Sequence, residues 1–210
     1  MPLTHEYNRY SACGKSFGLI GSNRSRIKFV KIDQYGGQYV ATGCCQFVSI
    51  WNCKTRQLVY SLDEVKSEIT VFDVSSVNEP LIAIGCIDGK IEVHNFIERT
   101  LKVQLDGHKL NVTCVCFDSK GMKLASGASD NTIIIWDMME ETGLFKLKGH
   151  TASVTQCIFM KNYNVLITSS KDKTVKFWDL DRQHCFKTFV AHRSPVNDFA
   201  IFANDTRYVY

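Results

Sequence analysis

The sequence that decides the fold is GHKLNVTCVCFDSKGMKLASGASDNTIIIWD at residues 107–137, which returns in altered form as GHTASVTQCIFMKNYNVLITSSKDKTVKFWD at residues 149–179. Both copies start with Gly-His, carry an aspartate six residues before a tryptophan, and end with Trp-Asp. Each of these three markers recurs after 42 residues. One period shared by three independent markers indicates a repeat protein.

The same register extends in both directions from these two copies. Residues 51–52 and 94–95 occupy the Trp-Asp position of two earlier units, and Asp88 occupies the position of the turn aspartate. Residues 191–192, Ala-His, stand where a fifth unit begins. We therefore expect repeats that end near residues 52, 95, 137 and 179, followed by a fifth unit that is truncated after residue 210.

Each unit has the pattern of four short strands. In the first quoted unit, apolar runs at residues 112–117, 124–127, 133–136 and 144–147 are separated by Ser-Lys-Gly, Ser-Asp-Asn and Glu-Glu-Thr-Gly turns. The periodicity alone predicts a β-repeat protein. The Gly-His start and the Trp-Asp end at this period resemble the WD-repeat family, in which each repeat forms one blade of a β-propeller. The resemblance implies an all-β, incomplete propeller of about four and a half four-stranded blades, from a ring of about seven or more.

The WD-repeat resemblance also implies a structural role for the marker residues. In that family a histidine, a hydroxyl on the second strand, the turn aspartate and the tryptophan form a hydrogen-bonded tetrad within a blade, which satisfies the buried carboxylate. Two complete tetrads carry over to this sequence: His108, Ser126, Asp130 and Trp136, and then His150, Thr168, Asp172 and Trp178.

The two earlier units depart from this tetrad. Ala41 and Ile84 stand where the hydroxyl is expected, His94 replaces a tryptophan and Cys45 replaces the first aspartate. We expect apolar packing to hold these two blades together.

A nucleophilic triad is the rival interpretation of His, Ser and Asp residues. Because the same three residue types recur in successive repeats, they favour a scaffold over a single catalytic site. His184 next to Cys185 is also a weak candidate, since neighbours on a strand point to opposite faces. We therefore expect no enzyme activity.

The nine cysteines are scattered through apolar segments without the paired spacing of a zinc site. We expect reduced thiols, no metal and no cofactor.

With 45% apolar residues, 22% charged residues and 3 prolines, the chain can form a core, which excludes disorder and collagen. The longest apolar run, residues 81–87, is too short for a membrane span. The opening residues show no secretory signal, so an intracellular protein without membrane contact is expected.

The ends of the sequence fit an open ring. Residues 17–20 are expected to form the outer strand that closes the last blade, and residues 27–32 the innermost strand of the first blade. The sequence is then the first part of an N-terminal propeller. A closed ring of four blades is the competing architecture.

Propellers bind partners through the loops on one face. Here the expected partner face is polar and mildly basic, and a merely solvated face is the alternative. It comprises Lys109, Asn111, Ser129, Asn131, Thr151, Ser153, Lys171, Lys173, Arg193 and Ser194. Lys28 is expected to point outward from its strand. The net charge of +4 permits contact with nucleic acid but does not predict it.

One branch of the WD-repeat family matches more closely. The segments WDLDRQHCFKT at 178–188, GLFKLKGH at 143–150, YNRY at 7–10 and FGLIGS at 17–22 resemble the start of the Utp-twelve/Dip-two family, known in animals as WD-repeat protein three. That family consists of nucleolar scaffold subunits of the small-subunit processome, within its UTP-B subcomplex. The resemblance implies a non-enzymatic role in processing precursor ribosomal RNA and in small ribosomal subunit biogenesis. It implies other WD-repeat subunits as partners, precursor ribosomal RNA and small nucleolar RNA as auxiliary contacts, and no small-molecule substrate. Another WD-repeat adaptor, such as a ubiquitin-ligase substrate receptor or a signalling scaffold, is the alternative.

Overall fold

The computed structural model describes residues 26–32, 37–44, 47–62, 65, 67–75, 77, 80–161, 163–190, 193–202 and 207–209. The regular structure of these residues consists of β-strands. Among the residues described, there is no helix of the length and hydropathy needed to span a membrane. The expected closing strand at residues 17–20, Cys45 and residues 191–192 lie outside the described residues.

Four sheets of four strands follow one another along the chain, and we number them blades one to four. Their strands, in chain order, are β1 (Arg26–Ile32), β2 (Gly37–Cys44), β3 (Phe47–Asn52), β4 (Leu58–Leu62); β5 (Ile69–Ser75), β6 (Leu81–Cys86), β7 (Lys90–Asn95), β8 (Thr100–Asp106); β9 (Val112–Phe117), β10 (Lys123–Ala128), β11 (Thr132–Asp137), β12 (Thr142–Lys148); and β13 (Val154–Phe159), β14 (Val165–Ser170), β15 (Val175–Asp179), β16 (His184–Phe189). β17 (Ala200–Phe202) and β18 (Arg207–Val209) form a separate two-stranded sheet after blade four. All neighbouring strands pair antiparallel.

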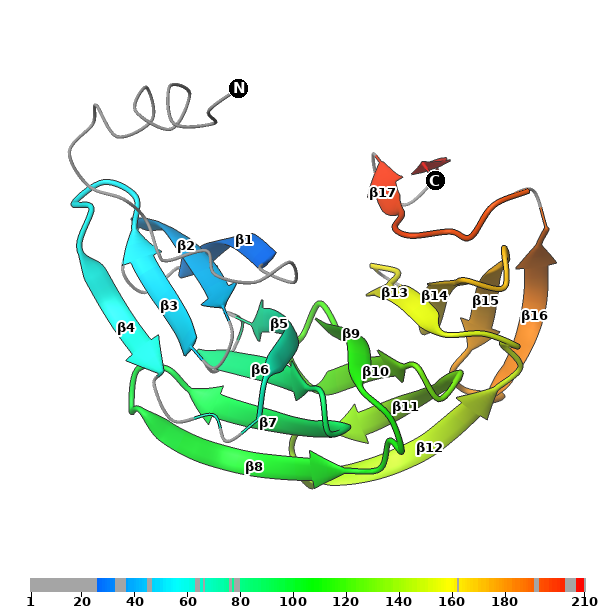
Figure 1. Ribbon diagram of the computed structural model, residues 1–210, viewed down its shortest axis with the longest axis horizontal. Helices are drawn as coiled ribbons and strands as arrows, with labels where there is room; N and C mark the ends of the chain where they lie inside the picture. Colours follow the sequence, from blue (N-terminus) through cyan, green and yellow to red (C-terminus); the bar gives the residue numbers. More distant parts are fainter. Residues whose placement is uncertain are drawn as a thin grey trace, which may run out of the picture.

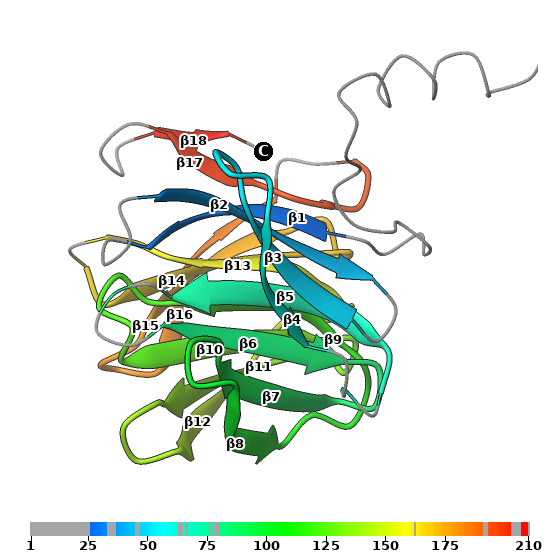
Figure 2. The same ribbon diagram turned by 90° about the vertical axis from the view of Figure 1, so that its left-hand side faces the viewer.

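The blades are arranged as sectors of an open arc (Figure 1). The first strand of each blade lies on the inner side of the arc, and the fourth strand, such as β8 or β12, lies on the outer side. Figure 2 shows β5, β6, β7 and β8 following one another in this order across blade two. The predicted fold class, an all-β propeller that is incomplete, is confirmed.

Both faces of an inner blade are buried, which explains its nearly continuous apolar strands. In β11, Ile134 and Trp136 belong to the core between blades two and three, whereas Ile133 and Ile135 belong to the core between blades three and four. Alternate residues of a strand point to opposite faces, so the run Thr-Ile-Ile-Ile-Trp contributes to two cores at once. The hydrophobic core of this protein therefore lies between the blades.

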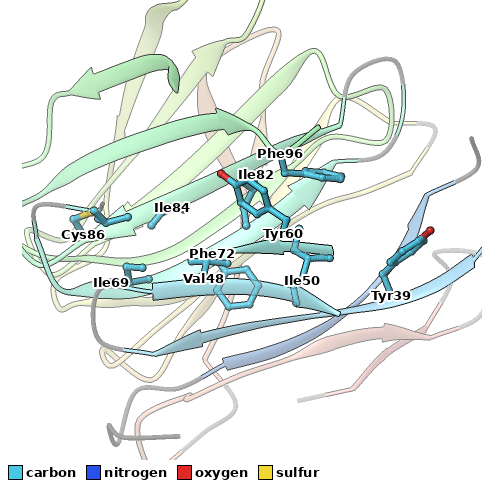
Figure 3. Packing of buried hydrophobic residues seen from close by; sticks show 12 residues of the cluster. Tyr39, Val48, Ile50, Tyr60, Ile69, Phe72, Ile82, Ile84, Cys86 and Phe96 are labelled. Atoms are coloured by element: carbon cyan, nitrogen blue, oxygen red, sulfur yellow. The ribbon is translucent and has the colours of Figure 1, made fainter. Parts of the chain in front are cut away.

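Blades one and two meet through an apolar core (Figure 3). Phe72 of β5 packs in the same cluster as Val48 and Ile50 of β3, and Ile82 and Ile84 of β6 complete the contact. All five side chains are buried. The hydroxyl position taken by Ile84 thus contributes to packing between these blades.

The turns repeat as regularly as the strands. The Asp or Asn that follows the marker tryptophan or histidine accepts hydrogen bonds from the backbone N–H groups two and three residues later, as in Asn52, Asn95, Asp137 and Asp179. The turn before each outer strand then contains one residue with positive φ: Arg56, Arg99, Glu141 and Gln183. The turn between the second and third strands has another at Gly89, Asn131 and Lys173. The aspartate of Trp-Asp is therefore a turn-capping residue.

Candidate functional site: histidine tetrads and the adjoining loop face

The four predicted residues of blade three lie together in one hydrogen-bonded network. Ser126 Oγ accepts a hydrogen bond from Trp136 Nε1 at 2.8 Å and lies 2.8 Å from His108 Nε2. His108 Nδ1 lies 3.4 Å from both carboxylate oxygens of Asp130. Ser126 is 0% exposed. It lies on β10, an interior strand of the sheet, and its hydroxyl connects His108 in the loop before β9 with Trp136 on β11.

Blade four repeats the network with tighter geometry. His150 Nδ1 lies 2.7 Å from Asp172 Oδ2, and His150 Nε2 lies 2.8 Å from Thr168 Oγ1. Trp178 Nε1 donates a hydrogen bond to Thr168 Oγ1 at 2.8 Å. The rings of His150 and Trp178 pack edge to face, with their centroids 6.1 Å apart.

Each network has a fifth side chain that the sequence reasoning missed. Thr132 Oγ1 donates to Asp130 Oδ1 at 2.5 Å, and Thr174 Oγ1 donates to Asp172 Oδ1 at 2.6 Å. The signal was present in the sequence as Asp-x-Thr, repeated after 42 residues. The aspartates also accept backbone N–H groups from the loop that follows each Gly-His, at 3.1 and 3.0 Å. The carboxylate thus attaches the loop to the turn.

The electrostatics favour a neutral histidine beside an ionised aspartate. Burial lowers the pKa of His108 and of His150, although the neighbouring carboxylates oppose the shift. Burial by itself would raise the pKa of Asp130 and Asp172, but hydrogen bonds from threonine hydroxyls, loop N–H groups and the histidines outweigh it and lower each pKa to about 2. A neutral imidazole that donates from Nδ1 to the carboxylate has a free lone pair at Nε2, which can accept the hydroxyl proton of Ser126 or Thr168.

This arrangement is unsuited to nucleophilic catalysis. Both hydroxyls are fully buried, and each already accepts a tryptophan N–H group. A nucleophile must reach a substrate, and these oxygens are enclosed by the blade. Each network connects the second and third strands of its blade, the turn between them and the loop that carries the histidine.

The other candidate nucleophile, Cys185, is not brought to a base. Its Sγ lies 3.4 Å from Thr188 Oγ1 and 3.3 Å from Lys187 O, while His184 is exposed. Burial raises the pKa of the Cys86 thiol to about 12. Six cysteines are free thiols: Cys53, Cys86, Cys114, Cys116, Cys157 and Cys185. The described residues contain no cluster of His, Cys, Asp and Glu suited to a metal ion.

Blade two uses different polar contacts. His94 Nε2 lies 3.1 Å from Glu92 Oε2 on the same strand, and Asp88 Oδ2 accepts a hydrogen bond from Ser67 Oγ at 2.7 Å. Asp88 therefore stands at the turn position of a tetrad, but its side-chain partner there is Ser67, and its Oδ1 accepts the backbone N–H of Lys90.

A buried carboxylate, Asp73, connects the first three blades. It lies on β5 with 4% exposure, and its Oδ2 accepts the backbone N–H of Phe117 in β9 at 2.9 Å. Lys28 Nζ from β1 forms an ion pair with its Oδ1. Lys28 is exposed, as expected, but its ammonium group does not simply face solvent, because the buried charge on the neighbouring blade provides a partner. The signal for Asp73 was one acid within the apolar run Ile-Thr-Val-Phe-Asp-Val-Ser.

The residues of the expected partner face lie on the loops next to the two tetrads, and hydrogen bonds link them from blade to blade. Ser129 Oγ lies 3.2 Å from Ser153 Oγ, and Asn131 Nδ2 donates to Thr151 O at 3.3 Å. Asn111 is half-buried, and its carbonyl accepts the N–H of Ser129. Exposed cationic side chains and one serine complete the set: Lys109, Lys171, Lys173, Arg193 and Ser194. These loops thus form a polar surface held by the blades, with positive charge at its exposed positions.

Comparison with known families decides the assignment. The sequence model for the WDR3 first beta-propeller domain matches residues 38–210. The chain belongs to the WDR3 first-propeller family. The matched range begins within β2 and includes both tetrads.

Individual relatives of the WDR3 family agree with the assignment. The chain is 39% identical over 97 residues to WD repeat-containing protein 3 of Homo sapiens, covering 46% of this chain and 10% of the relative. It is 31% identical over 140 residues to U3 small nucleolar RNA-associated protein 12 of Saccharomyces cerevisiae, covering 59% of this chain and 15% of the relative. The WD repeat-containing protein 3 homolog of Dictyostelium discoideum is 36% identical over 100 residues, 47% of this chain and 10% of the relative. The chain thus matches only about a tenth to a seventh of the length of these relatives.

Proposed function

We propose that this chain is part of a non-enzymatic scaffold in ribosome biogenesis, a subunit of the small-subunit processome within its UTP-B subcomplex. The observation that carries the proposal is the family match over residues 38–210, together with a yeast relative named as U3 small nucleolar RNA-associated. The proposed location is the nucleolus.

The structure supports a scaffold through the way the tetrads are used. Buried hydrogen bonds hold the loops of the partner face, and the hydroxyls involved have no access to a substrate. A rigid loop surface suits docking, because little conformational entropy is lost when a partner binds. Other WD-repeat subunits are the proposed partners on this face.

Exposed lysines and an arginine suit auxiliary contacts with the phosphates of precursor ribosomal RNA and small nucleolar RNA. Lys109, Lys171, Lys173 and Arg193 are all exposed, and no carboxylate shares an ion pair with them among the described contacts. Such contacts position an RNA without reading its sequence.

We also propose that the described blades are the first part of an N-terminal propeller with further blades. Blade one has large apolar side chains on the inner strand that no described neighbour covers: Phe29 is 79% exposed and Ile27 is 60% exposed. Such side chains are normally buried, and a closing blade would cover them.

Depletion and rescue in the native cell test the function. Loss of the protein is expected to cause accumulation of small-subunit ribosomal RNA precursors, and the wild-type gene is expected to restore processing. A variant with Lys109, Lys171, Lys173 and Arg193 all changed to Glu is expected to rescue poorly while remaining folded. Normal precursor levels after depletion would refute the proposal and favour another kind of WD-repeat adaptor.

A further inference from the structure

The partner face contains one sequence motif that the tetrads do not explain, Arg193-Ser194-Pro195. The sequence has 3 prolines, and Ser194 is the single serine or threonine that a proline follows. Proline-directed protein kinases select a serine or threonine by the proline that follows it. The sequence therefore offers such a kinase one candidate acceptor.

The segment around Ser194 has the extended, unpaired backbone that a kinase needs. Residues 149–153 are enough to connect β12 to β13, whereas the connection from β16 to β17 takes residues 190–199. Residues 193–199 belong to no strand and run from blade four towards β17 (Figure 1). A kinase binds its substrate as an extended chain, which a strand within a sheet cannot provide without unfolding.

The Ser194 side chain is accessible to an enzyme. The motif is exposed at all three positions, and Ser194 Oγ has no hydrogen-bond partner among the described residues. Two other hydroxyls of the partner face differ, because Ser129 Oγ and Ser153 Oγ lie 3.2 Å apart and both residues are half-buried. Leu110, which precedes Ser194 by two repeats, is 53% exposed in the loop before β9. The position thus faces solvent in an earlier blade as well.

The segment is attached beside the basic turn of blade four. Val196 N–H donates a hydrogen bond to Ser170 O at 3.3 Å. The turn that begins at Ser170 carries Lys171 and Lys173, which are both exposed. Ser194 is two residues from Val196, a span of about 7 Å in an extended chain. Its hydroxyl therefore lies in the same part of the partner face as these two lysines.

We propose that Ser194 is a phosphorylation site of a proline-directed kinase, and that its phosphate lowers the affinity of the partner face for RNA. In the reaction, Ser194 Oγ attacks the γ-phosphorus of ATP, the bond from this phosphorus to the bridging oxygen of ADP breaks, and the hydroxyl proton passes to a carboxylate of the kinase. The phosphate brings a charge of about −1.5 to −2 at pH 7 to a region with Arg193, Lys171 and Lys173. The effect on affinity rests on the proposed function, because it concerns RNA contacts of the same face. The acceptor serine does not.

Labelling of the intact protein by a purified proline-directed kinase and ATP tests the acceptor. Phosphopeptide mapping by mass spectrometry is expected to find phosphate on Ser194, and Ser194→Ala should remove it. Pro195→Ala retains the hydroxyl and should lower labelling of Ser194 about tenfold or more. Thr151→Ala is the matched control and should leave that labelling unchanged, because Thr151 is exposed on the same face but is followed by alanine.

The native protein provides a second readout of the acceptor. The Ser194 phosphopeptide is expected in protein purified from its native cell with phosphatase inhibitors, and an inhibitor of proline-directed kinases should reduce it. Absence of this phosphopeptide from the native protein, or equal labelling of Ser194 in the Pro195→Ala variant, would overturn the proposal.

Binding of a labelled oligouridine, read by fluorescence anisotropy, tests the effect of the phosphate. The phosphorylated protein is expected to bind about threefold or more weakly than the unphosphorylated protein at low salt, and less so at high salt. The Ser194→Ala variant should show no change after the same kinase treatment. Equal affinity before and after phosphorylation would refute the effect on RNA. An unphosphorylated protein that does not bind oligouridine would refute the RNA contacts proposed above and this effect with them, whereas the labelling still decides the acceptor.

Discussion

The Thr168→Val substitution tests directly what the tetrad contributes to blade four. Valine keeps the shape of the side chain and removes the hydroxyl, which lies 2.8 Å from both His150 Nε2 and Trp178 Nε1. The site is 0% exposed, so no bulk water replaces the lost partner. The indole N–H group and the imidazole Nε2 are then both buried without a hydrogen bond.

The expected cost follows from these two groups. A buried polar group without its partner costs about 1–3 kcal/mol; at about 1–2 kcal/mol for each of the two groups, Thr168→Val should destabilise the blade by about 2–4 kcal/mol. Thr168→Ser keeps the hydroxyl and removes one buried methyl group, which should cost about 1 kcal/mol. The difference between the two variants isolates the hydrogen bonds from the loss of packing.

Amide hydrogen exchange of the intact protein, read by mass spectrometry, measures this cost locally. Under conditions where exchange reports the opening equilibrium, Thr168→Val should speed exchange of β14 and β15 amides about 30-fold to several-hundred-fold, and Thr168→Ser only about fivefold. Blade one serves as the internal reference and should change little. If Thr168→Val exchanges no faster than Thr168→Ser, the tetrad does not stabilise the blade and the reasoning is wrong.

Three further perturbations have defined outcomes in the same exchange assay. Asp130→Ala should destabilise blade three by about 1–3 kcal/mol, because His108 and the loop N–H lose their acceptor. Asn131→Gly, which tolerates the positive φ of the neighbouring turn position and loses only an exposed hydrogen bond, should cost little; equal costs would contradict the network. Asp73→Ala should speed exchange in both β1 and β9, since it removes the partner of Lys28 and of a β9 amide; a change confined to β5 would show that Asp73 does not link the blades. Acidification should destabilise blades three and four. The lowered pKa values of the two histidines favour the neutral imidazole in the folded protein, so stability begins to fall as the pH drops below about 6.5. The lowered pKa values of the two aspartates cause a further loss of stability between about pH 4 and pH 2. Protection that stays constant from pH 7 to pH 5 in both blades would contradict the histidine part of this account.

The blade architecture was predictable because the sequence repeats its markers at one spacing. Short apolar runs between turn residues predicted strands at 112–117 and 124–127, and the structure places β9 and β10 there with one residue more at each end of β10. The WD-repeat resemblance supplied the propeller, since a repeat period by itself does not determine how blades are arranged.

Contacts between blades were harder to predict. Asp73 and Lys28 are 45 residues apart; the single acid within the apolar run of β5 indicates that Asp73 needs a partner, but neither strand alone indicates which residue that partner is. Thr132 and Thr174 were missed for a different reason, because a threonine after a turn is common and its contact with the aspartate depends on the turn geometry.

The central claim, a scaffold role in ribosome biogenesis, is tested most directly by gentle purification of the tagged intact protein from its native cell. The RNA and the proteins that co-purify are then identified by sequencing and mass spectrometry. The account predicts precursor small-subunit ribosomal RNA, its guide small nucleolar RNA and other WD-repeat subunits. Recovery of ubiquitin-ligase or signalling components, without ribosomal precursors, would contradict it.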